Sequence, residues 1–286
     1  MNDKEVCMKR ILALLVVAVL LFSACACQGG STTPVEGTEP ATTDEAQPLI
    51  TQDEAYNIYY DLIRKMIPEK MTEPQECDAD WIIHSVYSSP IYGDPWIGDQ
   101  TAKMQSKNVD GKLQFYLIRE NSENGAYYFG YINGDQYYQV DDIGKRVPPR
   151  ESSSWLFHLS MIISFYAPPF EQHAIRSFTT EKKDADTVLT FIVDGSALEA
   201  KYRKDLMADW VYSYEISAEE ISIVLTVDES KTPKTMTTHL SLKSFTPRGE
   251  LYSAKIVDTE YTFNRFQNVE FDLDDVVSRF SSAPTE

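Results

Sequence analysis

The chain has 286 residues, 43% of them hydrophobic, and a formal net charge of −18 at pH 7. So acidic a composition argues against nucleic-acid binding and against a protein that lies flat on an anionic membrane. Beyond residue 27, Cys77 is the only cysteine, so the sequence predicts no internal disulfide framework and a fold that rests on its own core. A pairing of Cys77 with Cys27 is the one alternative.

The first 24 residues have the layout of an export signal. Met8-Lys9-Arg10 precedes an apolar run over residues 11–22, and small residues follow it. A helix rises ~1.5 Å per residue, so this run covers roughly 18 Å, against a hydrocarbon core of ~30 Å. The run is too short to cross a membrane, and the sequence predicts a signal peptide over residues 1–24.

A cysteine follows this leader in a characteristic setting. Leu21-Phe22-Ser23-Ala24-Cys25 resembles the lipobox of bacterial lipoproteins. The resemblance implies that Cys25 carries a diacylglycerol and becomes the first residue of the mature chain. Cys27 is the alternative lipidation site, and a plain secretory signal is a third interpretation. The predicted protein is therefore held by lipid on the extracytoplasmic face of a cell membrane.

The segment over residues 25–50 is expected to be the lipid anchor and a flexible tether. It is rich in Gly, Ser, Thr, Pro and Glu and holds almost no large apolar side chain. Such a segment cannot bury enough surface to offset the entropy of ordering it. A spacer is favoured over a glycosylated or partner-binding stretch. One folded domain is expected over residues 51–286.

The folded domain is expected to begin with an amphipathic helix over residues 52–66. Thr51 and Glu54 form a capping-box pattern, apolar residues recur at helical spacing, and Pro68 stops the run. Residues 80–87 fit a short helix or a strand, and residues 88–100, rich in Pro, Gly and Asp, predict a loop.

Strand patterns dominate the remainder of the chain. The Asn133-Gly134 dipeptide between two aromatic runs predicts a hairpin, because both turn positions need a positive φ. Another hairpin is expected around the turn at residues 230–233. A capping-box pattern at Ser196 predicts a helix that carries Leu198, Tyr202, Leu206 and Trp210 on one stripe. The predicted strands cover residues 112–119, 126–132, 135–140, 174–181, 186–194, 221–228, 234–244 and 251–263; residues 269–280 form an acidic, mildly amphipathic tail.

A second helix is expected over residues 154–166, and it is apolar on most sides. Such a helix needs burial on most sides. It is interpreted either as a core helix or as one wall of a hydrophobic cavity. The candidate cavity wall consists of Leu156, Leu159, Ile163 and Tyr166.

The order of these elements resembles the LolA-like lipoprotein carriers and the related LppX/LprG-type lipoproteins. The local matches are Tyr261-Thr262-Phe263-Asn264-Arg265-Phe266 and the acidic-apolar stretch over residues 269–277. The resemblance covers about residues 51–280. It implies an α+β fold, a strongly curved antiparallel sheet forming an unclosed β-barrel, with helices covering its concave face. It also implies that acyl chains bind between sheet and helices.

No motif in the sequence indicates an enzyme, a metal or a cofactor. Gly-x-Ser-x-Gly, Ser-x-x-Lys and P-loop patterns are absent. His84, His158, His173 and His239 are scattered singly, without zinc-site spacing. Cys77 lies between Glu76 and Asp78, which should raise its pKa and weaken it as a nucleophile.

The sequence leaves two interpretations, neither of them enzymatic. The first is a membrane-anchored lipoprotein that binds a lipid or another hydrophobic ligand between sheet and helices. The second is a lipoprotein that docks a protein partner or a cell-wall component through the same scaffold. The two differ in whether the interior is hollow.

Overall fold

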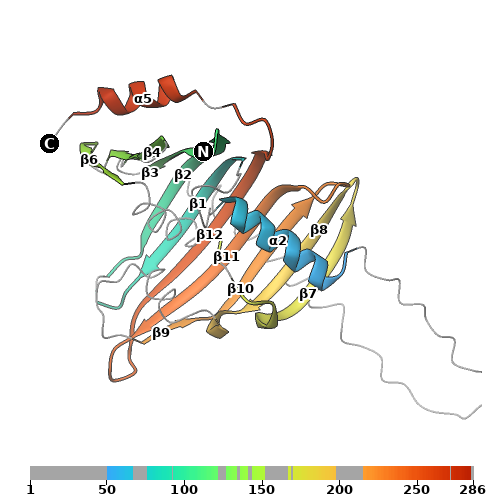
Figure 1. The fold of residues 1–286 in the computed structure, drawn as a ribbon. Helices are drawn as coiled ribbons and strands as arrows, with labels where there is room; N and C mark the ends of the chain where they lie inside the picture. Colours follow the sequence, from blue (N-terminus) through green and yellow to red (C-terminus); the bar gives the residue numbers. More distant parts are fainter. Residues whose placement is uncertain are drawn as a thin grey trace, which may run out of the picture. The chain divides into compact units, whose positions relative to one another are not determined.

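One large antiparallel sheet is the main feature of the computed structural model (Figure 1). The structure describes residues 50–66, 76–91, 93–121, 127–133, 136–140, 144–151, 167–168, 170–197, 215–270 and 272–284. In this part of the chain the sheet has twelve strands in the order β6-β5-β4-β3-β2-β1-β12-β11-β10-β8-β7, with β9 beside β11. The sheet is curved and open, with β6 and β7 at its two edges.

The strands form two antiparallel meanders that meet where the first strand pairs with the last. The first meander consists of β1 (Cys77–Ser88), β2 (Trp96–Val109), β3 (Lys112–Asn121), β4 (Tyr127–Asn133), β5 (Gln136–Val140) and β6 (Arg146–Glu151). The second consists of β7 (Ile175–Lys183), β8 (Asp186–Asp194), β9 (Glu215–Ala218), β10 (Glu220–Val227), β11 (Pro233–Phe245) and β12 (Leu251–Arg265). The pairing of β1 with β12 joins them.

Most of the predicted strands are confirmed. The ambiguous segment at residues 80–87 lies in β1, and the predicted pairing of 174–181 with 186–194 is that of β7 with β8. The loop expected over residues 88–100 is wrong beyond Pro95, because β2 begins at Trp96. β2, β6 and β9 were not predicted. The sequence does not predict β2 because its buried positions include the small residues Ala102 and Ser106, so its alternation of hydrophobic and polar residues is weak.

The helix α2 (Gln52–Met66) forms as the sequence predicts. The Thr51 hydroxyl accepts a hydrogen bond from the Glu54 amide at 3.3 Å, while the Glu54 carboxylate pairs with Lys231 instead of closing the capping box. The Tyr59 hydroxyl donates to the Pro168 carbonyl at 2.9 Å, and its ring lies 6.0 Å from that of Phe191 on β8. These contacts fix α2 against the β8 side of the sheet.

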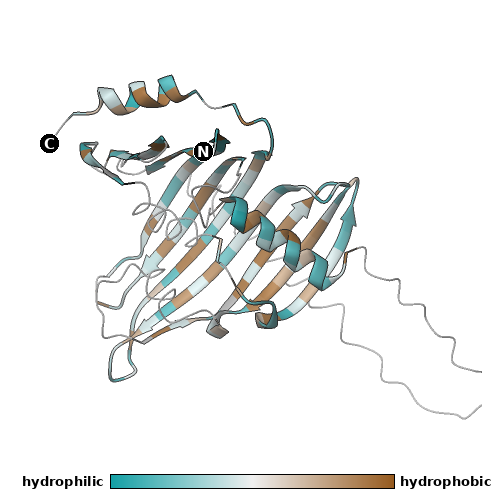
Figure 2. Cartoon of the chain, in the orientation of Figure 1, coloured by the Kyte–Doolittle hydropathy of each residue, from teal (hydrophilic) through white to brown (hydrophobic). Residues whose placement is uncertain are grey.

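Alternation along the strands gives the sheet two different faces (Figure 2). We call the first the α2 face, because its side chains form one buried cluster with those of α2; Trp81, Met104, Phe115, Phe191, Ile223, Leu240 and Tyr261 belong to it. The opposite side is the α5 face, named after the helix α5 (Leu273–Ser282). Residues of the α5 face alternate in sequence with those of the α2 face.

A much smaller apolar cluster holds α5. Val276 of α5 is buried together with Tyr116, Tyr131 and Val140 of the first meander. The Phe280 ring meets the rings of Tyr131 and Tyr138 edge-on, with centroids 5.5 and 5.4 Å apart. Asp272 caps the helix by accepting from the Asp275 amide at 2.9 Å. The tail expected to be mildly amphipathic is therefore a helix on the α5 face.

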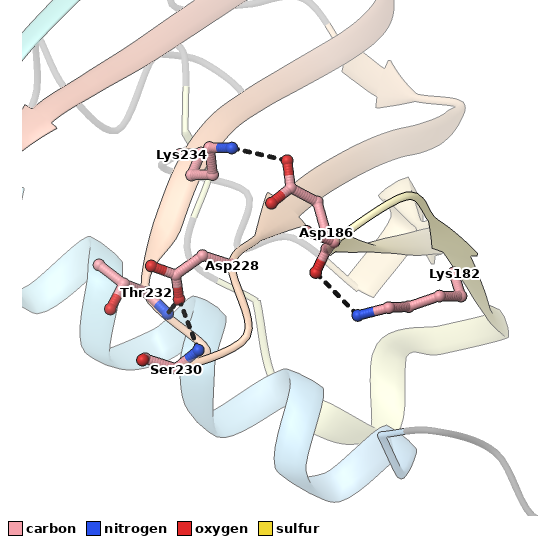
Figure 3. Close-up of polar contacts among 7 residues, drawn as sticks. Lys182, Asp186, Asp228, Ser230, Thr232 and Lys234 are labelled. Atoms are coloured by element: carbon pink, nitrogen blue, oxygen red, sulfur yellow. Dashed lines mark hydrogen bonds and ion pairs between the residues drawn. The ribbon is translucent and has the colours of Figure 1, made fainter.

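Two hairpin turns lie next to each other at one end of the sheet (Figure 3). In the β10–β11 turn the Asp228 carboxylate accepts from the amides of Ser230 and Thr232, each at 2.8 Å. Lys234 pairs with Asp186 of the β7–β8 hairpin at 2.7 Å. These contacts confirm the predicted turn and tie the two hairpins together.

The helices predicted over residues 154–166 and from Ser196 lie outside the described residues, apart from the short 3₁₀ turn Gly195–Ala197. The expectation that helices cover the concave face of the sheet therefore stays a prediction. No helix within the described ranges is long and apolar enough to cross a membrane.

Candidate functional site

Every site residue predicted from the sequence falls outside the described residues. The lipidation candidates Cys25 and Cys27 belong to this group. The predicted cavity wall of Leu156, Leu159, Ile163 and Tyr166 does as well. The candidate site is therefore built from the sheet, whose two faces offer different chemistry.

The α2 face is a continuous apolar surface arranged in rows across the strands. One row places Leu189, Leu225, Met236, Tyr261, Trp81 and Ala102 on six neighbouring strands. The next row contains Phe191, Ile223, Thr238, Thr259, Ile83 and Gln100. Cross-strand partners have Cβ atoms about 4.5–5.5 Å apart, so each row is a line of touching side chains.

Trp81 Nε1, Thr259 Oγ1 and Gln100 Oε1, which lie in these rows, have no hydrogen-bond partner among the described residues. Trp81 and Thr259 are 2% and 1% exposed, so bulk solvent does not reach them. Leaving a buried donor or acceptor unsatisfied costs about 1–3 kcal/mol. Thr259 and Gln100 are the cross-strand partners of Ile83, and Trp81 lies two residues before Ile83 on β1. We call Trp81, Thr259 and Gln100 the central band of the α2 face.

Polar residues nearer the end of the same face are paired. The Ser85 hydroxyl donates to the Gly98 carbonyl at 3.2 Å, and the hydroxyls of Ser244 and Ser253 lie 2.6 Å apart. Paired and unpaired polar groups therefore occur together on the α2 face, and Ser106 Oγ, further along β2, also has no partner among the described residues.

On the α5 face, a row of polar side chains crosses five strands: Ser222, His239, Asp258, His84 and Asp99. His84 Nδ1 lies 2.5 Å from Asp99 Oδ1, and His239 Nδ1 lies 2.6 Å from Asp258 Oδ1. The hydrogen bond to Asp258 raises the pKa of His239. The structure thus brings together two histidines that the sequence shows 155 positions apart, and sequence reasoning missed them because strand register is not local.

A second polar group on the α5 face surrounds Asp78, which is buried. Gln105 donates to its carboxylate at 2.5 Å, and Asn264 donates to it at 3.1 Å and to Asp80 at 2.8 Å. Because both carboxylate oxygens of Asp78 accept hydrogen bonds, its burial is compensated.

A cavity of about 420 Å³ lies on the α5 face beside Arg279 of α5. Its lining mixes Ile82 and Ile118 with the charged residues Asp80, Lys103, Glu120, Glu260 and Arg279. A groove of about 300 Å³ around His239 and Asp258 shares Glu260 with it. Charges of both signs give this cavity a polar character unlike that of the α2 face.

The sequence expectations also concern Cys77 and the metal-ligating residue types. Burial, and to a smaller extent the neighbouring Asp78, raises the pKa of Cys77 to about 12, in the direction that the sequence predicts. In the part of the chain that the structure describes, no group of three or more His, Cys, Asp or Glu side chains could hold a metal ion.

No protein-family model matches the chain, and no curated protein sequence matches it. The structure is similar to a DUF1329 family protein from Desulfovibrio piger, with 9% identity, 78% of this chain and 96% of that chain covered, and a TM-score of 0.27. It is also similar to an outer membrane lipoprotein-sorting protein domain from Vibrio parahaemolyticus, with 11% identity, 80% and 99% covered, and a TM-score of 0.23. These scores are too low to establish a fold or a function, so the family resemblance stays a prediction.

Proposed function

We propose that the chain is a membrane-anchored extracytoplasmic lipoprotein that binds a lipid or another hydrophobic ligand on the α2 face of its sheet. The observation that carries the proposal is the central band of that face, where buried polar atoms without partners lie within an apolar surface. A filled protein core pairs its buried polar groups. An amphiphilic ligand supplies both the apolar contacts and the missing hydrogen bonds.

Binding of this kind needs no catalytic group, metal or cofactor. The ligand is held by burial of apolar surface, which contributes roughly 25 cal/mol per Å². Its polar part is positioned by a few hydrogen bonds, as is usual in small-molecule sites. The lipid on Cys25 would keep the domain at the membrane from which such a ligand comes.

Native mass spectrometry of the full-length chain, purified from membranes in a detergent that is removed in the gas phase, tests ligand binding. The expected result is an additional mass that disappears on denaturation, while the covalent lipid stays on the protein. A clean mass without ligand, repeated after incubation with phospholipid and with glycolipid, would contradict the proposal.

Membrane fractionation tests the anchor separately. Cys25→Ala should move the protein from the membrane to the soluble extracytoplasmic fraction, because the acidic body has little affinity for anionic lipid. Cys27→Ala is the matched control and should leave the protein in the membrane. Retention of the Cys25→Ala protein together with release of the Cys27→Ala protein would move the lipidation site to Cys27.

A second candidate function is docking of a protein partner or a cell-wall component through the α5 face. The mixed-charge cavity beside Arg279 favours it, because its lining suits a polar partner. Co-sedimentation of the full-length chain with isolated cell wall tests this function. Arg279→Glu should abolish that binding and Trp81→Phe should not; the opposite pattern would exclude the α5 face.

A further inference from the structure

We infer, on the basis of the proposed function, that the α2 face recognises an acyl carbonyl, which accepts a hydrogen bond from the indole N–H of Trp81. Indole nitrogen is a donor only, so its missing partner must be an acceptor. Among the described residues no acceptor lies within hydrogen-bonding distance of Trp81 Nε1. A bound ligand with an acceptor oxygen can supply one.

The position of Thr259 identifies the acceptor further. Trp81 lies opposite Tyr261 in the β1–β12 register, and Thr259 is two residues further along β12, so Trp81 and Thr259 are diagonal neighbours. Such neighbours lie about 7–8 Å apart, within reach of a long aromatic side chain. A carbonyl oxygen has two lone pairs and can accept from both the Trp81 N–H and the Thr259 hydroxyl.

The surroundings exclude a charged group at this point. Trp81 has Ala102 and Tyr261 as its register partners, and Thr259 has Ile83 and Thr238. None of these four side chains carries a charge, and an unpaired phosphate or carboxylate buried there would be strongly unfavourable. A neutral ester or amide carbonyl fits, and an ether-linked or purely hydrocarbon chain leaves the Trp81 N–H poorly paired or unpaired.

A competition between two matched phospholipids tests the inference. The full-length chain is incubated with equal amounts of an ester-linked diacyl lipid and an ether-linked dialkyl lipid of the same headgroup and chain length. Native mass spectrometry reads the ratio of the two bound masses. We expect the ester lipid to be preferred about tenfold, the effect of one buried hydrogen bond, and the preference to vanish in Trp81→Phe. Phenylalanine keeps an apolar ring beside Tyr261, whose centroid lies 5.6 Å from that of Trp81.

Trp96→Phe is the matched control, because Trp96 is half-exposed at the start of β2 and its ring lies over Gly98, away from the central band. The ester preference should survive in this variant. A third lipid with an amide-linked acyl chain distinguishes the two sources of a carbonyl. If it binds as well as the ester lipid, the site accepts an amide carbonyl too. If it binds only as well as the ether lipid, the site recognises the ester.

The outcomes separate the two levels of the proposal. Lipid binding by the native chain with no ester preference would overturn carbonyl recognition and leave lipid binding intact. Absence of any bound lipid would overturn the proposed function itself. An ester preference that persists in Trp81→Phe would remove Trp81 as the donor, and its loss in Thr259→Val would then assign the threonine.

Discussion

On the α5 face, His84, His239 and Asp78 each find a polar partner on a neighbouring strand, whereas Trp81 and Thr259 at the centre of the α2 face find none among the described residues. These polar groups of the more exposed face are paired, whereas those at the centre of the buried face are not, in the part of the chain that the structure describes. Water could satisfy the polar groups of the α5 face. Hydrogen bonds within the protein are therefore needed less on the α5 face than at the centre of the α2 face. This difference is the observation on which the proposed ligand binding at the α2 face rests.

The two faces also differ in how much apolar surface they bury. The cluster of the α2 face runs through α2 and most strands of the sheet, while that of the α5 face has four buried members among the described residues. Hydrophobic stabilisation scales with buried apolar area. We therefore expect the α2 face to dominate the stability of the fold and α5 to be the element that detaches first.

The largest expected effect is that of Phe191→Ala on the α2 face. Phe191 is fully buried and its ring contacts those of Tyr59, Phe170 and Phe178. Its loss should lower the free energy of unfolding by about 3–5 kcal/mol, measured by urea denaturation.

Phe280→Ala is the matched change on the α5 face, where the ring is only partly buried. A smaller loss of about 1–2 kcal/mol is expected. Equal losses in the two variants would show that the faces contribute alike, and the comparison of their cores would fail.

Next in size is Asp78→Ala on the α5 face. Removal of the carboxylate leaves Gln105 without its acceptor, while Asn264 keeps its hydrogen bond to Asp80, and this should lower the free energy of unfolding by about 1–3 kcal/mol. Asp78→Asn, which keeps one acceptor oxygen, should lose less. Thermal unfolding of both variants measures these losses. If Asp78→Ala left the stability unchanged, the hydrogen bonds of Asp78 on the α5 face would not contribute to stability.

How far the fold follows from the sequence depends on how local each signal is. The helix over residues 52–66 and the β10–β11 turn were predictable because caps and turn residues act over a few positions. The β2–β3 hairpin was missed although Asp110-Gly111 is a strong turn signal, with φ of 53° and 77° at its two residues. The pairing of β1 with β12 has no local signal, since the two strands lie at opposite ends of the domain.

The candidate site was less predictable for the same reason. Trp81, Thr259 and Gln100 become neighbours only through the register of β1 with β12 and β2. In the sequence each reads as an ordinary strand residue, and the lack of a hydrogen-bond partner is a property of the folded chain alone. Apolar stripes such as the one predicted over residues 154–166 are visible in the sequence, whereas the polar atoms within an apolar face are not.

Thr259→Val tests the difference between paired and unpaired polar groups through a small change in stability. Valine has nearly the same shape and removes a buried hydroxyl that has no partner, so the ligand-free protein should change in stability by less than about 1 kcal/mol or become more stable. Ser253→Ala on the same face is the control, because it breaks the Ser244–Ser253 hydrogen bond and should destabilise by about 1 kcal/mol. Urea denaturation measures both. A clear loss in Thr259→Val would reveal a partner for this hydroxyl.

The smallest effect concerns the ionisation of His239 on the α5 face. The hydrogen bond to Asp258 raises the pKa of His239 above 6.5, so the charged form is favoured in the folded protein. The stabilisation it gives is fully present below pH 6.5 and is lost as the pH rises through the raised value. Asp258→Asn should lower the pKa of His239, seen as a shifted titration of its ring signals in NMR. Asp99→Asn, which changes the partner of His84, should leave the His239 titration in place. If Asp258→Asn also left the titration of His239 unchanged, the cross-strand hydrogen bond to Asp258 would not be what raises the pKa of His239.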